Sequence, residues 1–362
     1  MDRRRFLWLA ASGLAAEGCE RLPFLARPSA PPADDLDAIA AALVDGGQYI
    51  DGIPPIDFPD YDPVGAPAMP SSFFAPRAGE YHDDDVIDGI VPADGQPRAY
   101  PRFITVWHEI VNDIIAGQPI SLTYCPLTGS TLVFSGRLDG VETSFGTSGR
   151  LYNSNLVMAD RDSLSFWPQL LGIAVSGERK GERLRELPIA VTTTWGRWKA
   201  RYPTTVVLTT RTGRVRPYRS SPYGDYDRNE TIIFPVRARD GRFHPKRVVY
   251  GVREGGSATA VDKEAALRRG VTTFELLDRP FVALADEELQ AVRVFRAEAR
   301  GERVRFVRRG DAVVDERTGS RFSHMGIAVS GELVTERLEQ VSATEVQWFA
   351  WYAFYPRTEV IS

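Results

Sequence analysis

The chain has 362 residues, of which 43% are hydrophobic and 10% aromatic, a composition typical of a globular protein with one large domain or two ordinary ones. Its formal net charge of -4 gives no basic field for DNA or RNA, and no run of basic residues is interleaved with aromatic ones. We therefore expect no nucleic acid among its partners.

The first 19 residues predict export. Three arginines at positions 3–5 precede a short apolar run that ends at Ala16, a pattern that resembles a twin-arginine signal peptide and is too short to span a membrane. Cys19 stands where the cleavage site of a lipoprotein would lie, although Glu17 departs from the usual pattern. We expect a periplasmic or otherwise extracytoplasmic protein, with Cys19 as the candidate site of a lipid anchor to the membrane.

The segment between this signal and the central motifs is mostly irregular. Residues 20–50 predict a tether rich in proline and alanine with a short helix at 36–44, and residues 51–74 are studded with proline. Three aspartates at 83–85 are interpreted as a solvated acidic loop, because further carboxylates at ligand spacing are missing. Residues 86–91 and 98–100 predict a β-hairpin.

The stretch from residue 101 to 160 carries the candidate chemistry. Apolar residues at helical spacing predict a helix that begins near Arg102: Ile104, Trp107, Val111, Ile114 and Ile115. On this helix His108 lies within the apolar stripe and points inward, whereas Glu109 and Asp113 fall on the opposite side.

Residues 120–125 alternate in the manner of a β-strand that ends beside Pro126, which leaves Cys125 at the strand end. Residues 151–158 predict a further strand region. If the preceding helix packs over the first strand, His108 and Cys125 can approach each other. The sequence does not fix the distance between them.

A seven-residue word, GIAVSGE, occurs at 172–178 and again at 326–332. In both places it is followed by Glu-Arg-Leu, by two tryptophans three residues apart and by Tyr-Pro, which predicts a duplicated unit of roughly forty residues. The tryptophans predict a short helix laid on a sheet. Residues 258–270 and 285–290 predict two more helices. We expect a β-rich α+β fold of two related modules: the first at 51–253 and a second, mainly structural one at 254–362.

Four segments of the chain, HEIVND, TYCPLTGS, FGTSGRLYNSNLVMADRDS and FPVRARDGRFHPK, resemble the DUF3179 family of bacterial and archaeal proteins. The resemblance runs from about residue 51 to the C-terminus. It implies relatives and implies no particular reaction.

Cys125 is the one cysteine expected in the folded body, so it cannot close an internal disulfide. It is an inert buried thiol, a nucleophile or a metal ligand. As a nucleophile, Cys125 would need His108 to lower its pKa, with Asn112 or Asn153 orienting the imidazole. Asp160 joins this candidate catalytic group.

Arg161 is a further candidate of the same group; an exposed ion pair at the strand exit is the alternative interpretation for Asp160 and Arg161. As a metal ligand, Cys125 would bind copper or another transition metal together with His108 and His244. His324 and Met158 are further possible donors.

Two classes of function follow from these candidates. The first is an exported or lipid-anchored cell-envelope protein with a Cys125/His108 site, either a thiol-dependent enzyme or a mononuclear metal centre. The alternative is a non-catalytic envelope protein that binds a small molecule or an envelope partner.

Overall fold

The computed structural model describes residues 36–64, 81–92 and 95–362. The predicted signal and Cys19 lie outside the described residues. Within them the chain is rich in β-strands, and its helices are at most seven residues long, which confirms the β-rich fold class. None of the described helices has the length and apolarity needed to cross a membrane.

The chain divides at a long segment, residues 209–247, into two sets of elements. The first set is α1 (Leu36–Ala41), β1 (Val44–Asp45), β2 (Tyr61–Pro63), β3 (Val86–Ile90), β4 (Arg98–Pro101), α2 (Arg102–Thr105), β5 (Ile110–Ile115), β6 (Gln118–Cys125), β7 (Ser130–Ser135), β8 (Arg137–Leu138), β9 (Val141–Glu142), β10 (Phe145–Tyr152), β11 (Asn155–Asp160), β12 (Phe166–Pro168), β13 (Ala190–Thr194), α3 (Trp195–Arg201) and β14 (Val206–Leu208). The second set is β15 (Val248–Glu254), β16 (Ser257–Asp262), α4 (Lys263–Arg269), β17 (Val271–Leu276), β18 (Arg279–Asp286), β19 (Ala291–Arg296), β20 (Glu298–Ala299), β21 (Glu302–Arg303), β22 (Phe306–Arg309), β23 (Ala312–Asp315), β24 (Arg321–Phe322), β25 (Ala328–Ser330), β26 (Ala343–Gln347), α5 (Trp348–Phe354) and β27 (Glu359–Ile361).

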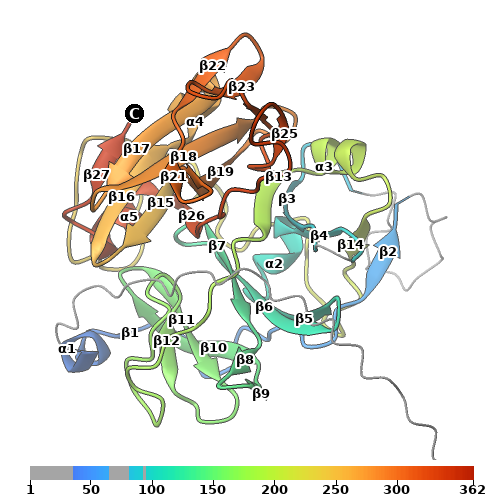
Figure 1. Ribbon diagram of the computed structural model, residues 1–362. Helices are drawn as coiled ribbons and strands as arrows, with labels where there is room; N and C mark the ends of the chain where they lie inside the picture. The colour runs from blue at the N-terminus through green and yellow to red at the C-terminus, as the bar shows by residue number, and fades with distance from the viewer. Residues whose placement is uncertain (1–35, 65–80, 93–94) are drawn as a thin grey trace, which may run out of the picture.

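The two sets have the same strand order. In the first, β13, β3, β4 and β14 lie side by side, with β14 parallel to β4 and the other pairs antiparallel. In the second, β26, β15, β16 and β27 have this order and these directions. The antiparallel sheet β5-β6-β7 is matched by β17-β18-β19. Figure 1 shows the second set, orange to red, above the green strands β10 to β12 of the first.

The two sets pack against each other through reciprocal contacts. Strand β13 contacts β19, and β26 contacts β7. The Thr193 hydroxyl donates to the Leu289 carbonyl at 2.5 Å, and the Gln347 backbone N–H donates to the Thr128 carbonyl at 2.9 Å. The largest hydrophobic cluster includes residues of both sets, so they share one core.

The tryptophan-bearing helices lie on their sheets as predicted. Gly89 of β3 faces the ring of Trp198 in α3, and Gly251 of β15 faces the ring of Trp351 in α5. A methyl group would come within 2.3 Å of the indole ring at Gly89 and within 2.2 Å at Gly251. Each indole N–H donates a 2.9 Å hydrogen bond to a threonine hydroxyl. Glycine is required at both places because the rings occupy the space of a side chain.

The predicted helix over residues 102–115 is wrong beyond its first turn. The helix α2 ends at Thr105, and residues 110–115 form the strand β5. Between them Glu109 has a φ of 58°, a left-handed backbone conformation that ends the helical path. Glu109 and Asp113 are buried rather than outward, and Ile114 is 61% exposed.

Other local predictions had mixed outcomes. The hairpin of β3 and β4 and the short helix near residue 36 are confirmed. Residues 258–262 belong to a strand, β16, and only α4 at 263–269 is helical. The helix predicted at 285–290 is wrong, since β18 continues to Asp286 and a turn follows.

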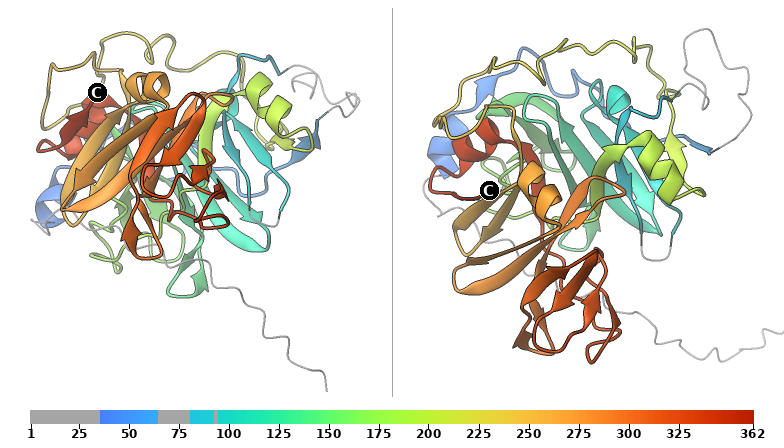
Figure 2. Two further views of the ribbon diagram at one scale, coloured as in Figure 1. Left: turned by 45° about the horizontal axis from the view of Figure 1, so that its top comes forward. Right: turned by 90° about the horizontal axis from the view of Figure 1, so that it is seen from above.

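The segment 209–247 contains neither helix nor strand. Figure 2 shows it crossing the outside of the molecule from the first set of elements to the second. Its side chains cover the end of the β6-β7 sheet, where Tyr226 donates a 3.0 Å hydrogen bond to the Leu127 carbonyl. It forms one wall of the site described next.

Candidate functional site

Cys125 ends β6, as predicted, and its side chain is buried, with 1% exposed. The sulfur accepts a hydrogen bond from the Leu156 backbone N–H at 3.3 Å and lies 3.9 Å from the Ser154 carbonyl, to which the thiol donates. Burial raises the pKa of the thiol to about 11, and the charge of Glu109 acts in the same direction. The thiol is therefore protonated at neutral pH.

His108 points inward, as expected, and both of its ring nitrogens have partners. Nδ1 lies 2.7 Å from the Pro54 carbonyl oxygen, which can only accept, so Nδ1 carries the proton. Nε2 lies 2.8 Å from the Tyr218 hydroxyl and accepts from it. Burial lowers the pKa of His108 to about 4, so the imidazole is neutral. The structure does not join His108 to Cys125 by a hydrogen bond, because each is bonded elsewhere.

The two candidate asparagines have structural partners. Asn112 donates to Asp57 and to the Phe145 carbonyl and accepts from Ser121, which ties β5 to its surroundings. Asn153 lies in the turn between β10 and β11, where its amide donates to a carbonyl at the end of α5 and accepts a backbone N–H of the segment 209–247. Neither amide orients the imidazole.

Asp160 and Arg161 also lie apart from the thiol. Asp160 accepts hydrogen bonds from Ser163, Ser165 and the indole N–H of Trp167, and so stabilises the turn after β11. Arg161 is partly exposed and pairs with two aspartates at 3.2 and 3.1 Å. Arg161 thus forms an exposed ion pair at the strand exit, as in the alternative interpretation, but Asp160 takes no part in it, because its side chain is buried.

His244 does not join Cys125 and His108. Its side chain is 44% exposed, Nδ1 accepts the Lys246 backbone N–H at 3.1 Å, and Nε2 lies 3.8 Å from a carboxylate oxygen of Glu230. In the part of the chain that the structure describes, the metal-binding group predicted from these three donors is not assembled.

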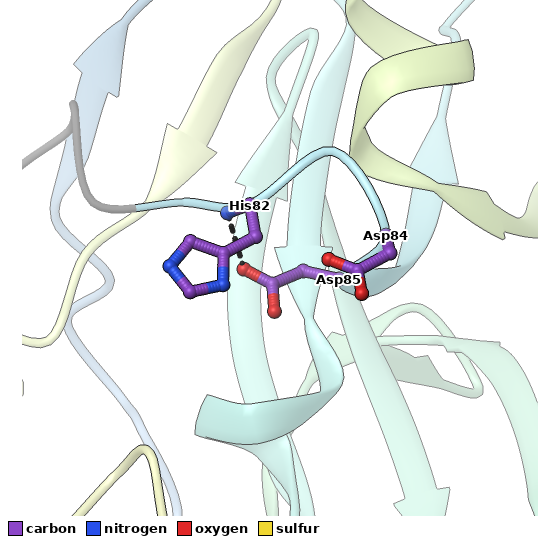
Figure 3. A group of neighbouring side chains, drawn as sticks. All are labelled: His82, Asp84 and Asp85. Atoms are coloured by element: carbon purple, nitrogen blue, oxygen red, sulfur yellow. Dashed lines mark hydrogen bonds between the residues drawn. The ribbon is translucent and has the colours of Figure 1, made fainter.

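A different group of possible metal ligands lies on the loop before β3. His82, Asp84 and Asp85 each offer a donor atom within 4.8 Å of the others. Figure 3 shows the three side chains on this loop. The Arg219 guanidinium already occupies this group: it donates to Asp85 at 2.8 Å and lies 3.0 Å from Nδ1 of His82. The acidic loop is thus held by an arginine, and a cation would have to displace it.

A cavity of about 450 Å³ lies beside the end of β6. Four parts of the chain enclose it: residues 46–53, the turn 106–109, strand β10 and the segment 209–247. Among the residues that line it, Leu156 donates its backbone N–H to the Cys125 sulfur, and Glu109 and Tyr223 interact with the thiol electrostatically. Its volume is in the range of small-molecule sites.

Glu109 is the acidic side chain among the described residues that line this cavity. It is 6% exposed, and burial raises its pKa to about 8, while a hydrogen bond with Tyr223 acts in the opposite direction. The residue directly before β17, in the same place in the second set, is Gly270 with a φ of 76°. A left-handed conformation costs a residue with a side chain roughly 1 to 2 kcal/mol. Glutamate therefore occupies position 109 at an energetic cost that glycine would avoid.

Lys246 also interacts electrostatically with the thiol. Its ammonium is 3.2 Å from the centre of the Tyr226 ring and 4.8 Å from that of Phe349, and no hydrogen-bond acceptor contacts it among the described residues. Burial lowers the pKa of Lys246 to about 8, while Asp227 and Cys125 act to raise it. A carboxyl and an amine, each with a pKa of about 8, therefore both interact with a thiol whose pKa is about 11.

This group joins the four segments that resemble one family. Glu109 comes from HEIVND, Cys125 from TYCPLTGS, and Lys246 from FPVRARDGRFHPK. The third segment supplies the Leu156 N–H and the Ser154 carbonyl that contact the sulfur. Sequence reasoning found Cys125 but not Glu109 or Lys246, and their position in these segments was the signal that could have found them.

Comparisons with known proteins agree with this resemblance. A family model described as "Protein of unknown function (DUF3179)" matches residues 50–358. No curated protein and no solved structure matches the chain. Because the family match covers most of its length, the chain belongs to the DUF3179 family.

Proposed function

We propose that the protein is a thiol-dependent enzyme of the cell envelope that acts on a small molecule bound in the cavity beside Cys125. The observation that carries this proposal is that two residues of the cavity wall act on the buried Cys125 sulfur: the Leu156 backbone N–H donates to it at 3.3 Å, and the charge of Glu109 raises its pKa. The ammonium of Lys246 also interacts with the thiol. Titratable groups with shifted pKa values next to a cavity are typical of active sites.

The roles follow from the surroundings of each group. Glu109, once ionised, accepts the proton of the Cys125 thiol, and its pKa of about 8 suits proton exchange near neutral pH. The Leu156 N–H and the positive charge of Lys246 stabilise the resulting thiolate. The sulfur then bonds to an electrophilic carbon of the substrate, the bond to the leaving group breaks, and Glu109 returns the proton to that group.

The thiol can be tested without knowledge of the substrate. In the full chain carrying Cys19→Ser, Cys125 is the remaining cysteine, and its alkylation by iodoacetamide can be followed from pH 6 to pH 11 by mass spectrometry. We expect the rate to rise with pH as the thiolate forms. Because the charge of Glu109 raises the thiol pKa, Glu109→Gln should move the profile to lower pH, whereas Glu142→Gln, at an exposed carboxylate, should not.

A second function, non-catalytic binding, is favoured by one observation: the thiol is 1% exposed, and Cys125 is not among the described residues that line the cavity. The same experiment separates the two. The enzyme is refuted if iodoacetamide does not alkylate Cys125 at any pH in the folded protein, or if Glu109→Gln does not shift the pH profile of alkylation. Either result would favour the binding protein.

The envelope location rests on the N-terminal sequence. Residues 1–19 would direct twin-arginine export, and acylation of Cys19 would anchor the protein to the membrane. Replacing the arginines at positions 3 and 4 by lysines should retain the protein in the cytoplasmic fraction, and Cys19→Ser should release it from the membrane fraction. An unchanged distribution for the lysine variant would argue against this route.

We also propose that the chain contains two copies of one module. The repeated GIAVSGE word, the common strand order and the paired glycine–tryptophan contacts support a duplication. At the end of β18, where Cys125 ends β6, the second copy has Asp286, which pairs with Arg293 at 3.2 Å. The second copy would then be structural, with the chemistry confined to the first.

A further inference from the structure

The cavity beside Cys125 has a cationic side chain without an anionic partner. The guanidinium of Arg216 lines it, is half-buried and lies 6.0 Å from the centre of the Trp107 ring. It donates a hydrogen bond to the adjoining Val215 carbonyl, and among the described residues it forms no ion pair with a carboxylate.

No ionised carboxylate of the described cavity wall balances the charge of Arg216. Glu109 is the carboxyl among the described lining residues, and burial keeps it protonated at neutral pH. The other arginine of the lining, Arg150, already has a partner, Asp45, at 3.6 Å. A guanidinium beside apolar side chains is stabilised by an anionic acceptor, so the cavity favours a ligand with a negatively charged group.

Gln48, Thr147 and Tyr223 add neutral polar groups to the wall. Much of the rest is apolar and is formed by Ile53, Val106, Leu127, Leu151, Leu156 and Phe234. Side chains of this kind favour an apolar ligand body and exclude a second charged group. The charge of the ligand must therefore lie at one end, next to Arg216.

We propose that the cavity binds a small organic anion, a carboxylate or a phosphate monoester, whose charged head lies on Arg216 and whose apolar body points toward Glu109 and Leu156. The inference rests on the proposed function, since it names the class of molecule that the cavity would present to Cys125. Arginine suits both heads because its planar guanidinium can donate two parallel hydrogen bonds.

Three probes with the same eight-carbon body separate the effect of the head: nonanoate, octyl phosphate and octylammonium. We expect isothermal titration calorimetry of the full chain to show at least about tenfold tighter binding of an anion than of octylammonium, the effect of one charged hydrogen bond. The anion that binds more tightly identifies the charged group of the ligand as a carboxylate or a phosphate. Equal affinity for all three probes, or preference for octylammonium, would overturn the inference.

Variants locate the head at Arg216. Arg216→Leu should weaken binding of the anion about tenfold, whereas Arg216→Lys keeps the charge and should retain much of the preference. Arg214→Leu is the matched control, because Arg214 is exposed and does not line the cavity. All three variants should unfold at temperatures close to that of the natural protein. Anion binding that is unaffected by Arg216→Leu would overturn the assignment.

The two proposals fail in different ways. If the anion binds through Arg216 while Cys125 remains unreactive to iodoacetamide, the enzyme is refuted and the anion site stands. If Cys125 reacts and responds to Glu109→Gln while no anion is preferred, the anion site is refuted and the enzyme stands.

Discussion

Glu109→Gln should change how the stability of the fold depends on pH. Glu109 is 6% exposed, and burial raises its pKa from 4.5 to about 8. Between these values the unfolded chain has lost the proton and the folded chain retains it, so the free energy of unfolding falls as pH rises, by about 1.4 kcal/mol per pH unit. From pH 5 to pH 8 this amounts to a loss of about 4 kcal/mol in the natural protein, which the amide of the variant cannot undergo.

Urea unfolding at pH 5, 6.5 and 8, followed by tryptophan fluorescence, measures this effect as a difference between the two proteins. His108 acts in the opposite direction, because its lowered pKa makes stability rise with pH between about 4 and 6.5. Since His108 titrates in both proteins, its contribution cancels. Three further titratable groups face Glu109 or its neighbours: Tyr223, Cys125 and Lys246. They titrate mainly at or above pH 8, the upper end of the measured range. A difference that stays constant from pH 5 to pH 8 would refute a carboxyl held protonated by burial.

Two further predictions concern stability. Gly89→Ala and Gly251→Ala should each lower the free energy of unfolding by about 2 to 4 kcal/mol, because the added methyl group meets a fully buried indole ring. The control Gly241→Ala places its methyl group in open space and should change the free energy of unfolding by less than about 0.5 kcal/mol. Equal effects of the three variants in urea unfolding would contradict this. Asp113→Asn should lower the free energy of unfolding by about 3 to 5 kcal/mol, because it breaks a buried ion pair with Arg98. The control Asp311→Asn, at an exposed carboxylate, should leave the free energy of unfolding unchanged in the same assay. An unchanged urea midpoint for Asp113→Asn would argue against the buried pair.

Elements with a local signal could be predicted from the sequence. Strand β6 alternates polar and apolar residues and stops at Pro126, because proline cannot donate to the ladder. The helices α3 and α5 are marked by tryptophans three residues apart and by the Tyr-Pro that follows. In each case residues close in sequence fix the structure, so no knowledge of the tertiary fold is needed.

The turn at Glu109 could not be predicted in this way. Ile104, Trp107 and Val111 fit the spacing of a helical face, yet the chain reverses at Glu109 and continues as a strand paired with β6. A helix would place Glu109 on the side away from His108, toward solvent. Because a helical period was assumed for these residues, Glu109 was not predicted to be buried. Glycine at this position, as at Gly270, would have signalled the turn.

The site itself depends on contacts between distant residues. His108 and Cys125 are close in sequence, but the Pro54 carbonyl and the Tyr218 hydroxyl, far from them along the chain, take both nitrogens of the imidazole. Lys246 reaches the neighbourhood of Cys125 from more than a hundred residues away. No pattern of spacing encodes such pairings, which only the folded arrangement of the two halves determines.

The connection between the halves has a consequence for how this architecture can diversify. Arg216, Tyr223 and Phe234 belong to the irregular segment 209–247, whereas Glu109 and Cys125 adjoin the ends of strands. Loops tolerate replacement and changes of length far better than strands do. Exchange of the segment 209–247 between relatives should transfer ligand preference while the reactive groups keep their positions. This segment is therefore the part of the chain to vary when selectivity is redesigned.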